Sequence, residues 1–313
     1  MSNKLDLIYI AGYGRSGSTL LGSLLHCQPL IHACGEMASF FNIYSSHSRL
    51  CSCGKTLDKC EFWNVVAEGL FQQGFLLEEF PYYSRIQKKR EAHWSHGGSF
   101  APTRYHGRYA NLMRPFFDAL AQHIQEKQVL VDSSKTAYTN PLRPIAISQL
   151  AKFRVRVIHL VRDPRGVAWS VKRGLNRRLE AGRQKKSLLP LSRAISGWIF
   201  ANRAACKLKS YFGEKNYFLV KYEDLVEKPD KVLENIANIW NLNLQKSMQV
   251  AKQARNGSEF QVPTMHQLAG NRMRFSKTFS ILPDYTWKEK LNSKTNTIVK
   301  ISTRNLMKKY GYV

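Results

Sequence analysis

Acidic residues are scarce in this sequence: 22 Asp and Glu stand against 48 Lys and Arg, which gives a formal net charge of +26 at pH 7. A positive field of this size concentrates anions near the surface, including nucleotides, nucleic acids, acidic lipid headgroups and anionic glycans. The sequence contains no recognisable DNA-binding or RNA-binding module, so we expect no specific nucleic-acid partner. The charge therefore predicts an anionic ligand without identifying it.

Long apolar runs are absent as well. No stretch approaches the roughly 20 apolar residues that a membrane-spanning helix needs, so we expect no membrane span. The first apolar strand begins at Leu7, which leaves no room for a signal peptide, and a cytoplasmic location is the simplest expectation. The 313 residues include 43% apolar residues and no internal repeat, which favours one globular domain over residues 1–313.

Cysteine is also uncommon, with six residues in the whole chain. Cys51, Cys53 and Cys60 form the only cluster, and its spacing matches no standard zinc pattern. Three interpretations stay open: a zinc site with His47 or Cys34 as the fourth ligand, a disulfide, or reduced cysteines that pack in the interior.

Four short apolar runs predict buried parallel strands, at residues 7–11, 128–132, 155–161 and 217–222. Helical patterns separate them, so the predicted fold is an α/β parallel sheet of the P-loop nucleotide-binding type, flanked by helices on both faces. Ligands of such sheets bind beyond the carboxyl ends of the strands.

Two segments lack a regular apolar pattern. Residues 82–102 are rich in basic, glycine and aromatic residues, and they predict a surface excursion of the kind that shapes a substrate entrance. Residues 176–190 are charged and carry no apolar stripe, which predicts a second surface loop. A last helix is expected from about residue 291 to 309.

A glycine-rich loop follows the first predicted strand and precedes a predicted helix over residues 18–27. Gly12 and Gly17 have the spacing of a Walker A loop, but Ser18 stands where that loop has its lysine. Glycines allow backbone N–H groups to surround an anion at a helix N-terminus. Asp132 follows a strand as a Walker B acid would, yet the missing lysine argues against the alternative of a P-loop kinase for a small hydroxylated substrate. A basic nucleic-acid-binding protein is the other alternative.

Two stretches resemble a known family. Residues 13–20, Tyr-Gly-Arg-Ser-Gly-Ser-Thr-Leu, resemble the 5′-phosphosulfate loop of sulfotransferases, especially of the carbohydrate and tyrosylprotein branches. Residues 161–170, which begin Val-Arg-Asp-Pro, resemble the 3′-phosphate motif of the same families. The resemblance spans nearly the whole chain. It implies a sulfotransferase that uses 3′-phosphoadenosine 5′-phosphosulfate, acts on a carbohydrate or small-molecule acceptor, and requires no metal.

The resemblance also implies which residues hold this donor. Arg162, at the end of a strand, suits a dianionic phosphate because a guanidinium group binds phosphate bidentately. A C-terminal stretch resembles the Gly-Asn-Pro-x-Arg-Phe stretch of carbohydrate sulfotransferases, with Arg272 in place of the proline. The expected donor residues are Gly14, Arg15, Ser16, Gly17, Ser18, Thr19, Arg162, Ser170, Tyr222, Gly270, Asn271 and Arg274.

Sulfuryl transfer needs a base for the acceptor and positive charge near the leaving oxygen. By resemblance to the Gly-Glu pair of tyrosylprotein sulfotransferases, Glu36 is the expected base. Lys135 resembles the family lysine at the bridging oxygen, and Arg15 is a further catalytic candidate. His26 and His32 lie nearby in sequence, but we expect them to be packing or surface residues.

Overall fold

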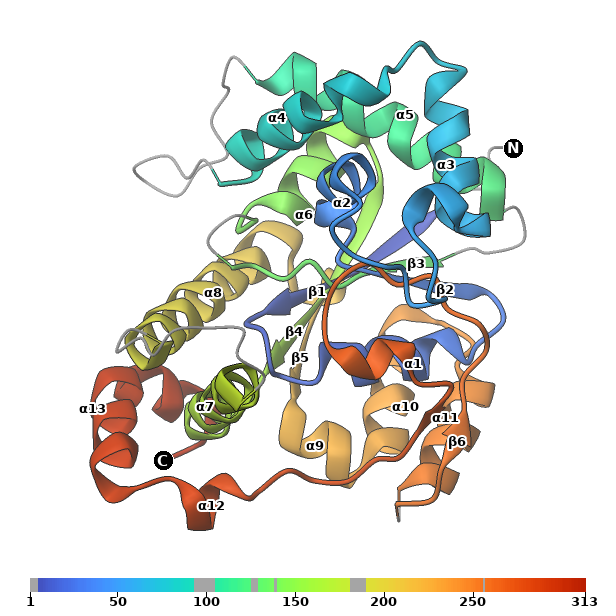
Figure 1. The fold of residues 1–313 in the computed structure, drawn as a ribbon. Coiled ribbons are helices and arrows are strands. Elements are labelled where there is room, and N and C mark those ends of the chain that lie inside the picture. The colour runs from blue at the N-terminus through green and yellow to red at the C-terminus, as the bar shows by residue number, and fades with distance from the viewer. Residues whose placement is uncertain (1–4, 93–104, 125–128, 138–139, 181–189, 256) are drawn as a thin grey trace.

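The computed structural model describes residues 5–92, 105–124, 129–137, 140–180, 190–255 and 257–313. Its centre is a five-stranded parallel sheet with the strand order β2-β3-β1-β4-β5 (Figure 1). The strands are β1 (Asp6–Gly12), β2 (Ile31–Gly35), β3 (Val129–Asp132), β4 (Arg154–Val161) and β5 (Tyr217–Lys221). The predicted parallel α/β sheet is therefore confirmed.

Side chains of the central strand β1 alternate between two apolar clusters. Leu7 and Tyr9 belong to the cluster on one face of the sheet, whereas Ile8 and Ile10 belong to the cluster on the other. All four are fully buried. Burial on both faces explains why this strand reads as a continuous apolar run and not as an alternating pattern.

Helices cover both faces of the sheet, as predicted (Figure 1). The first face packs against α2 (Phe40–Ser46), α3 (Glu61–Phe71), α4 (Phe80–Ala92), α5 (His106–Ile124), α6 (Arg143–Ala146) and α8 (Pro190–Phe212). The second face packs against α1 (Ser18–His26), α9 (Tyr222–Glu227), α10 (Pro229–Trp240) and α11 (Gln245–Ala254).

The remaining elements are α7, which follows β4, and the short elements and helices of the C-terminal part of the chain. Helix α7 contacts α8 and α13, and β6 pairs with β7 in a short antiparallel ladder. The bounds are α7 (Pro164–Glu180), α12 (Trp287–Lys290), α13 (Ser293–Tyr310), β6 (Phe260–Gln261) and β7 (Thr278–Phe279). Single helical turns occur at Met37–Ser39, Leu57–Lys59, Leu77–Glu79, Glu214–Asn216 and Arg272–Phe275, and a π-helical turn at Ile147–Ala151 extends α6.

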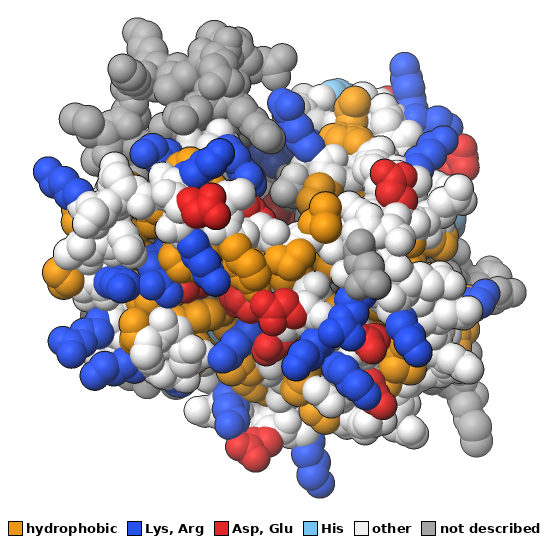
Figure 2. Space-filling model, turned by 90° about the horizontal axis from the view of Figure 1, so that it is seen from below, with side chains coloured by type: hydrophobic (Ala, Val, Ile, Leu, Met, Phe, Trp, Pro, Cys, Tyr) orange, Lys and Arg blue, Asp and Glu red, His pale blue; other side chains and the backbone are white. Residues whose placement is uncertain are grey.

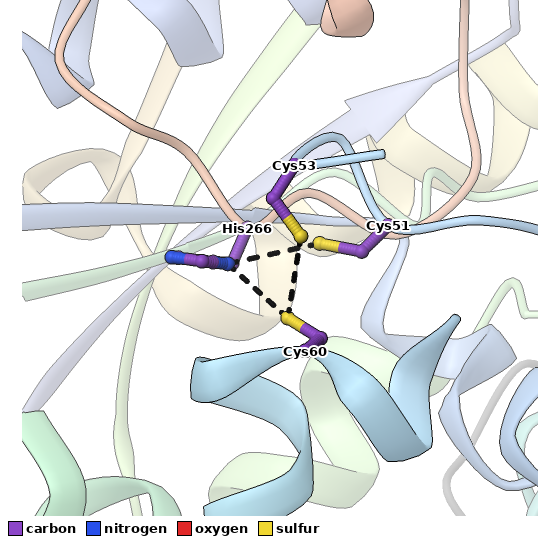
Figure 3. A group of neighbouring side chains, drawn as sticks. All are labelled: Cys51, Cys53, Cys60 and His266. Carbon is purple, nitrogen blue, oxygen red and sulfur yellow. Dashed lines mark hydrogen bonds between the residues drawn. The ribbon is translucent and has the colours of Figure 1, made fainter. Parts of the chain in front are cut away.

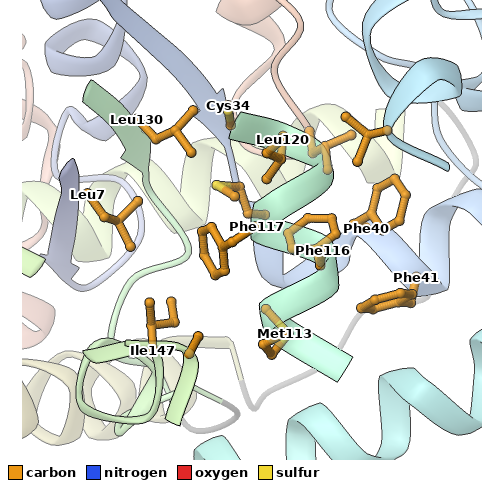
Figure 4. Packing of buried hydrophobic residues seen from close by; sticks show 14 of the residues in the cluster. Leu7, Cys34, Phe40, Phe41, Met113, Phe116, Phe117, Leu120, Leu130 and Ile147 are labelled. Atoms are coloured by element: carbon orange, nitrogen blue, oxygen red, sulfur yellow. The ribbon is translucent and has the colours of Figure 1, made fainter. Parts of the chain in front are cut away.

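An aromatic cluster fills the space between the first face of the sheet and its helices. The rings of Phe40 and Phe116 lie 5.0 Å apart, and those of Phe116 and Phe117 lie 5.6 Å apart. Figure 4 shows these side chains of α2 and α5 on the same side of the sheet as Leu7 of β1 and Leu130 of β3. The apolar side chains of α5 thus line one buried face of the helix.

The segment predicted as a surface excursion, residues 82–102, is helical in its first half. Residues 82–92 lie in α4, where Gln87, Arg90 and Glu91 are buried. The sequence did not indicate this helix, because it buries several polar side chains and so shows no apolar stripe. Residues 93–102 lie outside the described residues.

The second predicted loop, residues 176–190, is also partly helical. Helix α7 continues to Glu180, and Pro190 begins α8, while residues 181–189 lie outside the described residues. The buried residues that anchor α7 include Val167 and Ala168, which precede the predicted loop. The segment therefore needs no apolar stripe of its own to remain helical.

Strand β2 was missed by the sequence analysis. It contains only Ile31–Gly35, and His32 and Cys34 interrupt the β-branched pattern by which strands are recognised. The strand pairs with β3 at the edge of the sheet. Its position matters because Glu36 follows it directly.

The surface is rich in basic side chains. Figure 2 shows Lys and Arg side chains spread over one face of the molecule, with a smaller group of acidic side chains among them. On that face the positive charge is not gathered into one stripe. Among the described residues, no helix has the length and apolar character needed to cross a membrane.

Candidate active site

The glycine-rich loop leaves β1 and enters α1 through three residues with positive φ. These angles are +111° at Gly12, +68° at Arg15 and +93° at Gly17. A Cβ atom on Gly12 would lie 2.3 Å from the Leu160 carbonyl oxygen, and one on Gly17 would lie 2.8 Å from the Tyr222 ring. Both positions therefore require glycine, and Tyr222 packs directly against the loop.

The loop before α1 contains a buried polar side chain that has no hydrogen-bond partner among the described residues. Ser16 is 1% exposed, and its Oγ makes no hydrogen bond with any described residue. Helix α1 has no acidic residue in its first turn and no side-chain cap at Gly17. Such a helix start offers free backbone N–H groups and a favourable dipole to an anion. Ser18 and Thr19 are the first two residues of this helix.

Arg162 lies at the end of β4 and joins the loop to the C-terminal part of the chain. Its guanidinium group donates to the Arg15 carbonyl oxygen at 3.1 Å and lies 4.1 Å from the centre of the Tyr222 ring. It also donates to the main-chain oxygen of Asp284 at 2.9 Å, and the Asp284 carboxylate lies 3.4 Å away. Ser170 is buried on α7, the helix that follows β4.

The Asp284 carboxylate is shared by two arginines, since it lies 2.9 Å from Arg173 as well. Burial raises the pKa of Asp284, but the hydrogen bond from Thr286 and the charges of Arg162 and Arg173 outweigh this effect and hold the pKa below its usual range. One carboxylate thus serves two guanidinium groups, which leaves one net positive charge in this group of three side chains.

Glu36 and Lys135 come together beyond the ends of β2 and β3. The Lys135 ammonium group donates to Glu36 Oε1 at 2.5 Å and to the Ser133 carbonyl oxygen at 3.1 Å. Lys135 has a φ of +66°, and its own carbonyl oxygen accepts a hydrogen bond from the Tyr9 hydroxyl group. The turn after β3 therefore places the ammonium group beside the carboxylate.

A buried charge network supports this turn. Arg143 donates to Asp132 at 2.7 Å and to Glu91 at 2.5 Å, and all three side chains are fully buried. Tyr109 donates to the same Glu91 oxygen at 2.9 Å. Burial raises the pKa of Glu91, and the charge of Arg143 opposes that rise. Asp132 also accepts from the Ser134 backbone N–H at 2.9 Å, so the network fixes the residues next to Lys135.

The sequence analysis did not identify Glu91 and Arg143, because neither lies in a motif. The sequence carries no local signal for this pair, and only the structure shows the two opposite charges together in the interior. Asp132, which resembles a Walker B acid in sequence, faces Arg143 and is not exposed. This geometry does not resemble a magnesium ligand next to a nucleotide.

Residues 264–271, here called the covering segment, lie beside β2. The Glu36 N–H donates to the Leu268 carbonyl oxygen at 2.7 Å, and the Leu268 N–H donates to the Cys34 carbonyl oxygen at 2.8 Å. Gly35 has a φ of +72°, and a Cβ atom there would lie 2.4 Å from the Leu268 oxygen. A Cβ atom on Gly270 would lie 3.7 Å from Thr19 Oγ1 and 3.9 Å from Glu36 Oε1. The segment thus brings Gly270 to both the loop and Glu36.

The stretch after the covering segment forms a tight turn although Arg272 replaces the expected proline. Asn271 caps this turn by accepting from the Met273 N–H at 3.3 Å. Arg274 donates to the Gly270 carbonyl oxygen at 3.3 Å, while its Nε has no partner among the described residues. Burial lowers the pKa of Arg274, and the nearby charge of Arg49 adds to this effect.

A cavity of about 380 Å³ opens beside the Glu36–Lys135 pair. It is bounded by the loop, by the segment after β2, by the turn after β3 and by helices α2, α4 and α7. Its lining residues are Tyr13, Gly14, Arg15, Glu36, Ala38, Ser39, Asn42, Lys88, Ser134, Lys135, Ala137, Asn140 and Val171. The loop, Glu36 and Lys135, which are far apart in sequence, therefore share one cavity.

The histidines and the cysteine cluster lie away from this cavity. His26 and His32 are buried packing residues, and His32 stacks on Phe62 at 4.3 Å. His47 pairs with Asp58 at 3.3 Å and does not join the cysteines.

The fourth member of the cysteine cluster was also predicted wrongly. Cys51, Cys53 and Cys60 lie with His266, a residue of the covering segment, and not with His47 or Cys34. The sequence could not indicate this partner, because Cys51 and His266 are 215 positions apart.

Comparison with known proteins agrees with this architecture. A sulfotransferase domain from the curacin biosynthetic pathway has 18% sequence identity and a TM-score of 0.54, over 96% of this chain and 97% of that one. A sulfotransferase from Mycobacterium avium has 11% identity and a TM-score of 0.52, over 99% of this chain and 77% of that one. At these identities the similarity establishes the fold. Curated protein sequences give no significant match.

A family model described as "Sulfotransferase family" matches residues 7–246. The match includes the glycine-rich loop, Glu36, Lys135, Arg162 and Tyr222, and it ends before the covering segment. It covers well over half of the chain, and this protein therefore belongs to the sulfotransferase family.

Proposed function

We propose that this enzyme transfers a sulfuryl group from 3′-phosphoadenosine 5′-phosphosulfate to a hydroxyl group or an amine of a carbohydrate or small-molecule acceptor, with Glu36 as the base. The observation that carries the proposal is the contact of 2.5 Å between Glu36 and Lys135 at a cavity that also contains the glycine-rich loop. A base and a cation beside an anion-binding loop are what in-line sulfuryl transfer needs from a protein.

Two separate sites suit the two anionic ends of the donor. The Ser16 hydroxyl group, which has no partner in the described part of the chain, and the start of α1 suit the 5′-phosphosulfate. Arg162 suits the 3′-phosphate, because its planar group can donate two parallel hydrogen bonds to one phosphate. Ser170 on α7 and the Tyr222 ring complete this second site in the proposal. Gly270, Asn271 and Arg274 would cover the donor from the C-terminal side.

When bound, the donor supplies the sulfuryl group, and the chain supplies proton transfer and charge. Glu36 would accept the proton of the acceptor as its oxygen or nitrogen attacks sulfur. Lys135 and Arg15 would donate hydrogen bonds where negative charge develops on the departing oxygen. The backbone of the glycine-rich loop would hold the reacting group in line with both.

The acceptor would occupy the cavity. A volume of about 380 Å³ suits a small molecule or one or two sugar units better than a folded protein surface. Lys88, from the helix that replaces the predicted excursion, lies in its wall and would favour an acceptor with an anionic group. Tyr13 and Val171 add apolar contact area on the side of the loop and α7.

Ligand-dependent thermal stability tests the donor. Adenosine 3′,5′-bisphosphate should raise the melting temperature in proportion to the logarithm of its concentration, whereas ATP with Mg²⁺ should not. Stabilisation by ATP with Mg²⁺ alone, or by neither nucleotide, would contradict the proposal. The acceptor is then found by incubating the enzyme with ³⁵S-labelled donor and panels of sugars, hydroxylated small molecules and tyrosine peptides, with Glu36→Gln as the blank.

A further inference from the structure

Cys51, Cys53, Cys60 and His266 form a cluster of side chains (Figure 3). None of the four lines the proposed catalytic cavity, and the proposed sulfuryl transfer makes no use of them. Three segments contribute to the cluster: a turn after α2, the residue that precedes α3, and the covering segment. The ligand atoms of all four residues lie within 4.8 Å of one another. We propose that these four side chains bind one Zn²⁺ ion, which fastens the covering segment to the body of the enzyme.

The distances between the ligand atoms fit a zinc tetrahedron. With Zn–S bonds of about 2.3 Å and Zn–N bonds of about 2.0–2.1 Å, two sulfurs lie about 3.8 Å apart, and a sulfur and a nitrogen about 3.5 Å apart. Here Cys53 Sγ and Cys60 Sγ are 3.6 Å apart. His266 Nδ1 lies 3.2 Å from Cys60 Sγ and 3.8 Å from Cys51 Sγ. Each of these separations is within about 0.3 Å of its tetrahedral value.

A disulfide fits this arrangement less well. The sulfur atoms of a disulfide are about 2.05 Å apart, much less than the 3.6 Å between Cys53 and Cys60. Any one disulfide would also leave the third cysteine and His266 without a role. Instead, Figure 3 shows the three sulfur atoms grouped around the Nδ1 edge of the imidazole ring, as ligands of one ion would be.

The surrounding backbone holds the cysteines in place. The Cys51 carbonyl oxygen accepts from the Gly54 N–H at 2.9 Å, and Gly54 has a φ of +86°, so the chain makes a tight turn around the first two cysteines. Cys60 immediately precedes α3, and the positive end of that helix favours a thiolate there. Cys51 and Cys60 are fully buried.

Contacts to its backbone, to its ring and to the two neighbouring residues fix the position of His266. Trp63 donates to the His266 carbonyl oxygen at 2.7 Å. The His266 ring stacks on Phe62 with 5.4 Å between centroids and 10° between planes, which leaves Nδ1 directed at the sulfurs. Ser52 donates to the Met265 carbonyl oxygen at 2.6 Å and accepts from the Gln267 N–H at 2.7 Å. The cysteine turn and the covering segment are therefore already joined around the site.

Four protein ligands leave no open position, so the ion would be structural and not catalytic. Its binding would release protons from the cysteine thiols, since zinc binds thiolates and neutral imidazole. Zinc binding would also affect the surroundings of Glu36, because Leu268, two residues after His266, bonds to the Glu36 backbone. The ion would thereby hold the segment that carries Leu268 and Gly270 against β2 and the glycine-rich loop.

Metal content of the purified, full-length protein tests this proposal. Mass spectrometry of the metal should find about one zinc per chain, and Cys60→Ser and His266→Ala should each lower this content at least fivefold. Cys206→Ser is the matched control, because Cys206 is a free cysteine near Tyr310 and away from the cluster, and it should retain the zinc.

A second measurement does not depend on whether a variant folds. The wild-type protein, stripped by a chelator under reducing conditions, should bind one Co²⁺ and show the visible bands of a tetrahedral thiolate-bound ion. Stripping should also speed tryptic cleavage after Arg272 several-fold, and added Zn²⁺ should reverse this. Folded, reduced protein that binds neither ion, or an intact mass two daltons low from a disulfide within the cluster, would overturn the proposal. None of these readouts requires sulfotransferase activity.

Discussion

The Lys135 ammonium group lies 2.5 Å from Oε1 of Glu36, although the two residues are 99 positions apart in the chain. Lys135 reaches this position from a turn with positive φ that a buried Asp132–Arg143–Glu91 network supports. Only Oε1 of Glu36 accepts a side-chain hydrogen bond from the described residues, which leaves Oε2 available for the proton transfer that we propose.

Replacing Glu36 with Gln separates catalysis from donor binding. The amide keeps the size of the side chain but cannot act as a base, so we expect turnover to fall about 100-fold to 10,000-fold. The dissociation constant of adenosine 3′,5′-bisphosphate, measured by calorimetry, should change by less than about threefold. Glu234→Gln, which breaks an exposed pair with Lys231, is the control and should leave both quantities unchanged. Equal losses of turnover and affinity would show that Glu36 is structural.

Replacing Arg162 with Ala should mainly weaken binding of the bisphosphate. Hydrogen bonds to a charged group are worth about 1.5–3 kcal/mol, which corresponds to a dissociation constant about 10-fold to 150-fold higher. Arg162→Lys should recover only part of the loss, because an ammonium group cannot donate the paired bonds of a guanidinium group. Arg304→Ala, at an exposed position of α13, controls for the change in net charge. An unaltered affinity in Arg162→Ala would remove this residue from the donor site.

Replacing Ser16 with Ala should change binding without changing stability. The buried Oγ has no partner among the described residues, so its removal costs the free protein no hydrogen bond. We expect the free energy of unfolding in urea to stay equal or to rise slightly, while bisphosphate binding weakens several-fold. A large loss of stability would instead indicate that Ser16 supports the loop.

Much of the glycine-rich loop could be predicted from sequence because its conformation depends on local spacing. Gly12, Gly17 and Ser18 are neighbours in the chain, and glycines at this spacing between a strand and a helix are typical of an anion-binding turn. Buried strands with continuous apolar residues could also be predicted from sequence. Helix α4 could not be predicted, because most of its buried side chains are polar. The pairing of Glu91 with Arg143 could not be predicted either, because it depends on tertiary contacts that no local pattern encodes. The position of His266 beside the cysteines could not be predicted for the same reason.

Replacing Gly35 with Ala should detach the covering segment from β2. The new Cβ would lie 2.4 Å from the Leu268 oxygen, in addition to the strain of a φ of +72°. Gly74→Ala is a matched control, because Gly74 has a φ of +84° and open space around its Cβ position. We expect about 1 kcal/mol of destabilisation in Gly74→Ala and at least twice that in Gly35→Ala, measured by urea unfolding. Faster proteolysis of the covering segment should occur only in Gly35→Ala, and equal effects in both would contradict the contact.

His159 predicts a pH dependence of stability. Burial lowers the pKa of His159 to about 4, against about 6.5 in an unfolded chain, although a hydrogen bond with Asn202 partly opposes this. The unfolded state therefore binds more protons between these pH values, so this residue makes the protein less stable as pH falls from about 7 to about 4. The shift corresponds to a loss on the order of 3 kcal/mol.

Unfolding in urea at pH 7 and at pH 4.5 measures this effect. The difference between the two pH values should be smaller in His159→Gln than in the wild-type protein. His47→Gln, at an exposed histidine, should keep the wild-type difference. An identical pH dependence in all three proteins would contradict the lowered pKa, because it would mean that His159 has the same pKa in the folded and unfolded states.

The bridge between Gly35 and Leu268 has a consequence for how the enzyme is made. All five strands of the sheet have left the ribosome once Lys221 has emerged, so a growing chain can assemble its nucleotide-binding layer early. The backbone partner of Glu36 and the imidazole of His266 arrive only with the last part of the chain. The sheet can therefore be synthesised in full before the segment that completes the surroundings of Glu36 has emerged.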